Sequence, residues 1–176
     1  MKITCDLCGH INIIKNPEVF RGMKNVVFHC KNKTCTTKIK FQFPIEKKIS
    51  ESSENQTVAI FNNSKIKSAF LEYANIDNDR VCVNVSLGLN HVGRQSKGYS
   101  QEIQIETKDR HMSRTHAILI GKAHDGNFMS ILRGYNTKNK INLNGRIMSE
   151  NEEVYLMEGD EIVLGTTSLI YKVNYH

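Results

Sequence analysis

The chain has 176 residues and a net charge of +6, with 39% hydrophobic and 24% charged residues, 2 Pro and 11 Gly. This composition is typical of a folded protein and excludes collagen-like and low-complexity architectures. No apolar run approaches the roughly 20 residues of a membrane-spanning helix, and the first residues lack the apolar stretch of a signal peptide. We therefore expect a cytoplasmic protein, whose five Cys serve as metal ligands or core residues rather than in disulfides.

The positive charge is concentrated at the N-terminal end. Residues 1–48 contain 10 Lys or Arg against 3 Asp or Glu, whereas residues 58–176 contain 14 against 13. A small basic domain of this kind is a candidate for binding nucleic acid or an acidic protein. The alternative is a solvated surface on which Lys maintains solubility.

Four cysteines dominate the N-terminal end. Cys5 and Cys8 form a Cys-x2-Cys pair, and Cys30 and Cys35 a Cys-x4-Cys pair. Two tight turns that each present two thiolates supply the tetrahedral sulfur set that Zn²⁺ prefers, with no open position for catalysis. The pattern resembles a zinc ribbon, in which two such turns cap a small three-stranded sheet. The wider second gap leaves open whether His10 or His29 replaces one Cys, and a redox pair or a disulfide-bonded module are the alternatives.

A polar segment follows the cysteine region. Ile39, Phe41, Phe43 and Ile45 alternate with other residues and predict a strand. Residues 46–57 contain one apolar residue and show no periodicity, which predicts a linker. We therefore divide the chain into a zinc-ribbon-like domain at 1–45, a linker at 46–57 and a second domain at 58–176.

The second domain reads as a series of short strands. Alternating or short apolar runs occur near residues 81–87, 103–105, 117–120, 131, 143, 162–164 and 169–171, separated by turn signals at 78–79, 125–127, 144–145 and 158–160. Many short strands separated by turns are typical of a β-sandwich or barrel. Residues 64–74 fit a short helix or a first strand. Cys82, within an alternating run, is expected to be a small core residue.

Four local patterns follow one another through residues 89–165. They are Val92-Gly93-Arg94, Ser113-Arg114-Thr115-His116, Thr137-Lys138-Asn139 with Asn144-Gly145, and a turn into a buried strand over 156–165. Together, on a β-rich background, they resemble a forkhead-associated (FHA) domain over roughly residues 67–175. The resemblance implies an all-β fold: an FHA-type sandwich of about eleven strands, here preceded by the small zinc ribbon.

The resemblance also assigns functional residues. Loops at one end of an FHA sandwich bind phosphothreonine, and the residues that match the binding positions are Arg94, Ser113, Arg114, Lys138 and Asn139. Ser113 corresponds to a position whose hydroxyl and backbone N–H both meet the phosphate. Gly93, His116 and Gly145 match structural positions of the site. Lys138 and Lys140 stand where the family usually has Thr and Gly, so the ligand preference of this loop is open.

Three functions follow from these patterns. The first is a phosphothreonine-dependent protein-interaction module in signalling, with a threonine-phosphorylated partner and a structural zinc ribbon as a second docking surface. The second is a nucleic-acid-binding or transcription-linked adaptor that acts through the basic ribbon. The third is a scaffold whose phosphopeptide site is degenerate. We expect no enzyme, because the sequence offers no supported catalytic set and no Gly-rich nucleotide loop.

Overall fold

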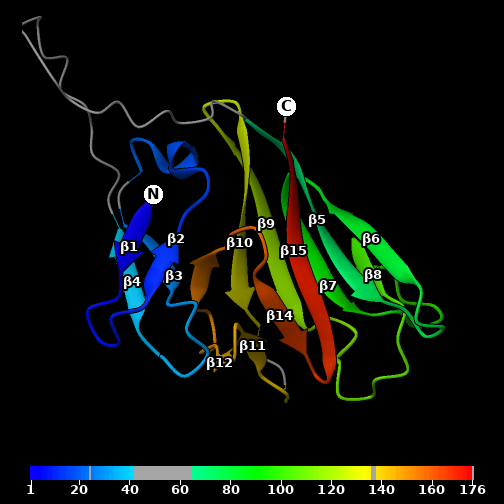
Figure 1. Ribbon diagram of the computed structural model, residues 1–176. Helices are drawn as coiled ribbons and strands as arrows, with labels where there is room; N and C mark the ends of the chain where they lie inside the picture. Colours follow the sequence, from blue (N-terminus) through cyan, green and yellow to red (C-terminus); the bar gives the residue numbers. More distant parts are fainter. Residues whose placement is uncertain (24, 42–64, 136–137, 176) are drawn as a thin grey trace, which may run out of the picture.

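The computed structural model describes residues 1–23, 25–41, 65–135 and 138–175, and its regular structure is almost entirely β-strand. The described residues at 1–41 form what we call the N-terminal unit, and those from 65 onward form a β-sandwich (Figure 1). The all-β fold class is confirmed. The predicted linker at 46–57 and the continuation of the predicted strand to Ile45 lie outside the described residues.

Two antiparallel hairpins make up most of the N-terminal unit. Strands β1 (Lys2–Thr4) and β2 (Ile11–Ile13) pair with each other, as do β3 (Val26–His29) and β4 (Lys38–Phe41). Between the hairpins the chain forms a short 3₁₀ helix, η1 (Pro17–Phe20), with Pro near its first position, where a missing N–H costs nothing. The described unit therefore has two separate two-stranded sheets, which differs from the three-stranded sheet of the ribbon resemblance.

The sandwich consists of a five-stranded and a six-stranded sheet. The first has the order β13 (Glu153–Tyr155), β10 (Asn127–Gly134), β9 (Ala117–His124), β7 (Gly88–Arg94) and β8 (Ile103–Ile105). The second has the order β12 (Arg146–Ile147), β11 (Ile141–Leu143), β14 (Glu161–Leu164), β15 (Thr167–Tyr175), β5 (Ile66–Ala74) and β6 (Arg80–Val85). Neighbouring strands are antiparallel, except for the parallel pair β7 and β8. The strand number agrees with the expectation of about eleven.

The core lies between the two sheets because side chains alternate along each strand. Leu71, Leu119, Leu132 and Leu164 are completely or almost completely buried there, and each stabilises the fold by roughly 1.5–3 kcal/mol through burial. Tyr171 is also buried, and its hydroxyl donates to Ser130 Oγ at 3.1 Å. This bond satisfies the one polar atom of the ring within the apolar layer.

The same alternation decides two open questions from the sequence. Residues 66–74 form strand β5 rather than a helix, with Ala69, Leu71 and Tyr73 facing the core. The expectation that Cys82 is a core residue is wrong, because the period of two that turns Val85 inward on β6 turns Cys82 to solvent.

Turn residues behave as the sequence indicates. Asn78, Asp125 and Asn144 have positive φ angles, and Gly126 and Gly145 follow the last two with positive φ. Asn, Asp and Gly tolerate this left-handed conformation better than other residues. The turns therefore fix where the hairpins of the sandwich reverse.

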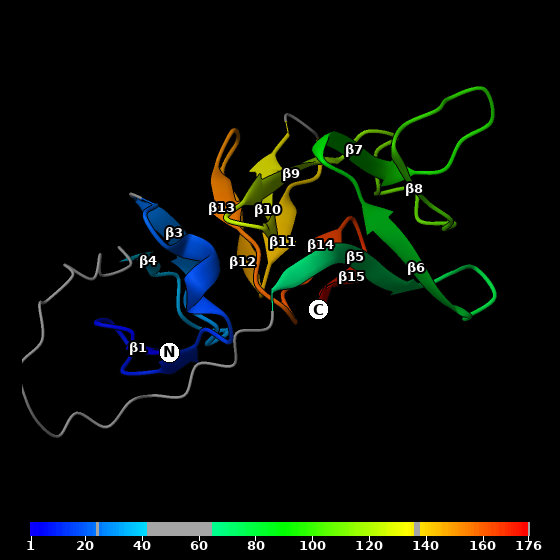
Figure 2. The same ribbon diagram turned by 90° about the horizontal axis from the view of Figure 1, so that it is seen from above.

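The N-terminal unit packs against the edge of the sandwich, where β3 contacts β13 (Figure 2). Val19, Phe20 and Phe28 share one apolar cluster with Met129 and Met157 of the sandwich. The Phe20 ring also meets Tyr155 edge-on, with a centroid distance of 5.7 Å, a favoured aromatic geometry. The two parts therefore share an apolar interface.

A buried ionic network lies across the same interface. Glu152 Oε1 of the sandwich accepts from His29 Nε2 and Lys38 Nζ of the N-terminal unit, each at 3.0 Å, and from the Arg146 guanidinium. Arg146 Nε in turn donates to His29 Nδ1 at 3.0 Å. His29 is therefore a neutral ring with its proton on Nε2, and burial followed by the Arg146 charge lowers its pKa.

Candidate functional site

Three loops meet at the lower end of the sandwich in the view of Figure 1. Arg94 ends β7, Ser113 and Arg114 lie between β8 and β9, and Lys138 and Asn139 lie between β10 and β11. Strand pairing brings the first two loops to the same end of the sandwich, because β7 and β9 are neighbours in one sheet. Hydrogen bonds then tie the loops to one another.

Arg94 is held directly against the loop that carries Ser113. Its backbone N–H donates to the Ser113 carbonyl at 3.0 Å, and its side-chain Nε donates to the Met112 carbonyl at 3.3 Å. The guanidinium is half-buried, and its terminal nitrogens have no hydrogen bond within the described parts of the chain. The arrangement fixes a fork of charged donors beside a serine.

Gly93 is required for this close approach. A Cβ atom at this position would lie 1.9 Å from the Arg114 carbonyl oxygen and 2.7 Å from that of Ser113. Both distances are far below van der Waals contact, so no side chain fits without moving the loop. This explains why a glycine precedes the arginine.

His116 braces the same loop from inside the sandwich. The ring is completely buried, and its Nδ1 accepts the backbone N–H of Ser113 at 3.0 Å. Burial lowers the pKa of His116, and the Asn139 backbone and the Asp109 carboxylate only partly offset this effect. The neutral imidazole thus accepts the Ser113 backbone N–H, and the expected contact of this N–H with phosphate stays a prediction. The Ser113 hydroxyl, which has no hydrogen bond within the described residues, remains accessible to a ligand.

Asn139 connects the third loop to the second. Its side-chain Nδ2 donates to the His111 carbonyl at 2.8 Å. Lys138, the preceding residue, is exposed. Thr137, part of the sequence pattern, lies outside the described residues.

Arg114 lies over an aromatic ring that the sequence analysis did not single out. Its guanidinium carbon is 5.4 Å from the centroid of Tyr99, within the range of a cation–π contact. The Tyr99 hydroxyl and Thr115 Oγ1 are 3.0 Å apart. Tyr99 thus connects the loop after Arg94 with the loop that carries Arg114, and no local pattern in the sequence indicates this pairing.

Gly145 lies away from these loops. It follows β11 at the end opposite to Lys138 and Asn139, has a φ angle of +86°, and its Cβ position is 3.3 Å from the Lys33 carbonyl of the N-terminal unit. This glycine therefore serves a turn, as the sequence pattern predicts, and also lies at the interface between the two parts.

Residues 90–165 match the family model of the FHA domain. The chain contains an FHA domain. No curated protein matches the chain in sequence. The match begins just before Arg94 and ends after Leu164, so it includes all three loops.

Three solved structures are similar to this chain. The yeast Pml1 splicing factor is 17% identical, with a TM-score of 0.50 over 62% of this chain and 81% of that chain. The FHA domain of the CT664 protein from Chlamydia trachomatis is 21% identical, with a TM-score of 0.49 over 62% and 99%. A structure from work on phosphothreonine-dependent FHA domain interactions is 20% identical, with a TM-score of 0.48 over 61% and 97%. Each of these alignments covers little more than the sandwich.

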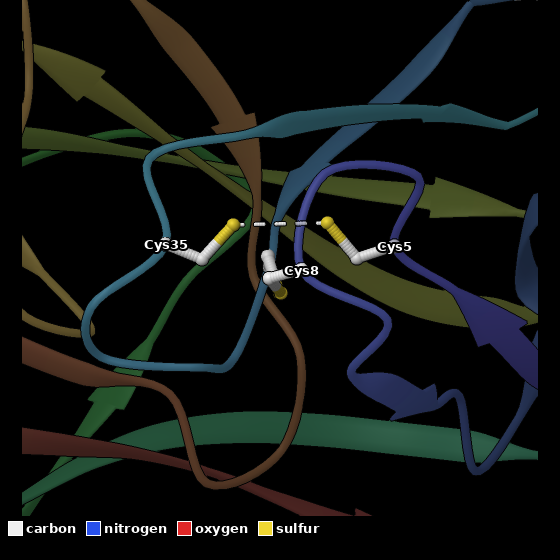
Figure 3. A group of neighbouring side chains, drawn as sticks. Cys5, Cys8 and Cys35 are labelled. Carbon is white, nitrogen blue, oxygen red and sulfur yellow. Dashed lines mark hydrogen bonds between the residues drawn. The ribbon is translucent and has the colours of Figure 1, made fainter.

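The N-terminal unit, which lies outside the FHA match, holds the four cysteines together. Figure 3 shows three of them, Cys5, Cys8 and Cys35. The sulfurs of Cys5 and Cys35 are 3.7 Å apart, those of Cys8 and Cys30 are 3.6 Å apart, and all four lie within 4.8 Å of one another. A Zn²⁺ ion with Zn–S bonds of about 2.3 Å places its four sulfurs about 3.8 Å apart. The four thiols therefore fit a tetrahedral metal ion.

The surroundings of the thiols favour their charged form at two positions. The backbone N–H of Cys8 is the main cause that lowers the pKa of Cys5 to about 6, and the Thr37 hydroxyl is the main cause that lowers the pKa of Cys35. Gly9, with a φ angle of +69°, turns the chain out of the first pair. Cys30 is buried, which raises its pKa to about 12, so the surrounding protein alone does not favour the thiolate at this position.

His29 is not part of the sulfur cluster, because its ring nitrogens contact Arg146 and Glu152. The second cysteine pair is shaped by Asn32, whose carbonyl accepts the Cys35 N–H at 2.9 Å and whose side chain accepts the Thr34 N–H at 3.2 Å. Asn32 therefore stabilises the wider gap between Cys30 and Cys35.

No helix in the described part of the chain has the length and apolarity needed to cross a membrane.

Proposed function

We propose that the chain is a phosphothreonine-dependent protein-interaction module, in which Arg94, Ser113, Arg114, Lys138 and Asn139 contact the phosphopeptide. FHA domains generally act in this way and are not enzymes. The observation that carries the proposal is the position of Arg94. Its backbone N–H donates to the Ser113 carbonyl and its Nε to the Met112 carbonyl, which holds the guanidinium against the loop that carries the Ser113 hydroxyl. We propose no catalytic activity.

The chemistry of these groups fits a phosphate ester. Phosphothreonine carries about −1.5 to −2 charges and three acceptor oxygens at neutral pH. The terminal nitrogens of Arg94 supply paired charged donors, Ser113 a neutral donor, and Arg114 a second cation that Tyr99 supports. Asn139 ties its loop to His111 through one amide hydrogen, and its place in the family pattern is a contact with the peptide backbone.

The decisive experiment is a titration of the full chain with a degenerate phosphothreonine peptide library, measured by fluorescence anisotropy. Arg94→Ala should weaken binding about tenfold to a hundredfold, the range for lost charge-assisted hydrogen bonds. Arg133→Ala is the matched control, because Arg133 lies on β10, outside the three loops, and pairs with the exposed Glu153. Phosphate-independent binding, or full affinity in Arg94→Ala with an unchanged Tm, would contradict the proposal.

We also propose that Cys5, Cys8, Cys30 and Cys35 bind one structural Zn²⁺ ion. Thiols that bind a metal, and do not form disulfides, are typical of a reducing compartment such as the cytoplasm. The purified protein should contain about one zinc per chain by elemental analysis. Cys30→Ser should lose it, whereas Cys82→Ser, which changes the exposed cysteine of β6, should retain it. Zinc-free wild-type protein, or retention in Cys30→Ser, would refute the site.

The charge of the N-terminal unit supports intramolecular packing rather than nucleic-acid binding. Lys15 pairs with Glu158 at 2.9 Å, Lys31 with Asp160 at 3.2 Å, and Lys38 with Glu152 at 3.0 Å. These cations already contact carboxylates of the FHA domain. We therefore propose that the unit is an integral support of the FHA domain, with any docking surface on its outer face.

A further inference from the structure

The cations at the loop end of the FHA domain differ from several lysines of the N-terminal unit. No ion pair joins any of them to a carboxylate among the described residues, whereas Lys15, Lys31 and Lys38 are all paired. The unpaired cations of these loops are Arg94, Lys97, Lys108, Arg110, Arg114, Lys138 and Lys140. Unpaired like charges on adjacent loops repel one another and attract an anionic ligand.

The carboxylates that lie nearest to these cations in the sequence contact other groups. Glu102 Oε2 accepts the backbone N–H of His91 at 2.8 Å and lies 2.9 Å from His91 Nδ1. Asp109 accepts the backbone N–H groups of Thr166 at 2.6 Å and His111 at 2.8 Å. Glu106 is the remaining carboxylate on these loops and is exposed. The loops therefore carry a clear excess of positive charge.

One hydrogen bond joins the two loops that carry Arg110 and Lys140. Asn139 Nδ2 donates to the His111 carbonyl at 2.8 Å. Arg110 directly precedes His111, Lys140 directly follows Asn139, and both side chains are exposed, so each cation belongs to a residue next to this bond. Neither Arg110 nor Lys140 belongs to the residues that we propose to contact the phosphothreonine.

We propose that Arg110 and Lys140 form a second phosphate site, so that the preferred ligand of the FHA domain is a doubly phosphorylated peptide. The inference rests on the proposed function, because the first phosphate occupies Arg94, Ser113 and Arg114. One phosphothreonine carries a charge of about −2, which two arginines balance. The guanidinium of Arg110 and the ammonium of Lys140 remain for a second dianion, and a lysine binds phosphate without a fixed orientation.

The test compares a singly phosphorylated peptide from the library with versions that carry a second phosphothreonine at each of the four positions on either side. At one or two positions the second phosphate should tighten binding about tenfold at fixed salt, with a steeper loss of affinity as salt is raised. The double variant Arg110→Ala/Lys140→Ala should abolish this gain and leave binding of the singly phosphorylated peptide within twofold. Lys122→Ala, an exposed lysine near the other end of β9, should retain the gain.

Each outcome decides the matter. Less than twofold gain at every position would overturn the inference, as would an equal gain from Glu at the same position or an equal loss in Lys122→Ala. The failure of the proposed function is distinct: the singly phosphorylated peptide would then not bind, or would bind Arg94→Ala as tightly as wild type.

Discussion

Glu152→Gln tests whether the ionic network holds the N-terminal unit against the FHA domain. The side chain of Glu152 is only 6% exposed and contacts Arg146, Lys38 and His29. Glutamine keeps the shape and removes the charge. Arg146, whose side chain is 15% exposed, then loses its counter-ion in a poorly solvated position.

The magnitude follows from the pKa of Glu152. Burial alone would raise this pKa, but the Ser149 N–H, Lys38 and Arg146 outweigh it and lower the pKa from 4.5 to about 2. Since one pKa unit corresponds to about 1.4 kcal/mol, the charged form contributes about 3 kcal/mol to the free energy of unfolding. A depressed carboxylate pKa gives stability that is fully present above about pH 4.5 and is lost as the pH falls toward about 2.

The assay is urea unfolding at pH 7, followed by circular dichroism because the chain has no Trp. Glu152→Gln should lower the free energy of unfolding by about 3 kcal/mol. The difference between wild type and variant should shrink when the measurement is repeated between pH 5 and pH 3, because the wild-type carboxylate then takes up its proton.

Glu153→Gln is the matched control on the neighbouring residue. Glu153 pairs with Arg133 on the surface, where the two side chains are 45% and 36% exposed, and exposed pairs contribute about 0–1 kcal/mol. Equal losses in the two variants, or a Glu152→Gln effect that stays constant from pH 7 to pH 3, would refute the role of the buried network.

Two further predictions concern the supports of the phosphate site. Gly93→Ala should lower both the Tm and the phosphopeptide affinity, because its Cβ would lie 1.9 Å from the Arg114 carbonyl oxygen. Gly98→Ala is the control: its Cβ meets no atom, so it should cost about 1 kcal/mol of stability through its positive φ alone. Equal losses of Tm in the two variants would contradict this prediction. His116→Asn should flatten the decline in the free energy of unfolding below about pH 6.5. Burial lowers the pKa of His116 in the folded protein, so protonation favours the unfolded chain. An unchanged dependence of the free energy of unfolding on pH, measured by urea unfolding, would argue against a buried neutral ring.

Local chemistry allowed much of the fold to be predicted. Alternating apolar residues such as Val81, Val83 and Val85 correspond to strand β6, and Asn144-Gly145 corresponds to a turn with positive φ. Both depend on neighbours within a few residues. The cysteine spacing likewise predicted a four-sulfur cluster, because each pair is set by one short turn.

Other features depend on contacts between residues far apart in the chain. The bond between His29 and Glu152 joins residues separated by 123 positions, and Tyr99 meets Arg114 through a loop that has no periodicity. Cys82 has an apolar side chain, yet the register of β6 places it on the solvent face. No motif indicates the first two contacts, because packing between distant segments decides them. The alternation of Val81, Val83 and Val85, by contrast, already places Cys82 on the opposite face.

Local sequence patterns are enough to predict the all-β class and the metal-binding spacing of the cysteines, and to nominate Arg94 and Ser113 as candidate phosphate residues. Long-range packing decides that His116 accepts the Ser113 backbone N–H, that Gly145 lies against the N-terminal unit, and that lysines such as Lys31 pair with the FHA domain. The physical reason is that a motif records which groups are present, whereas their hydrogen-bond partners depend on packing between distant segments.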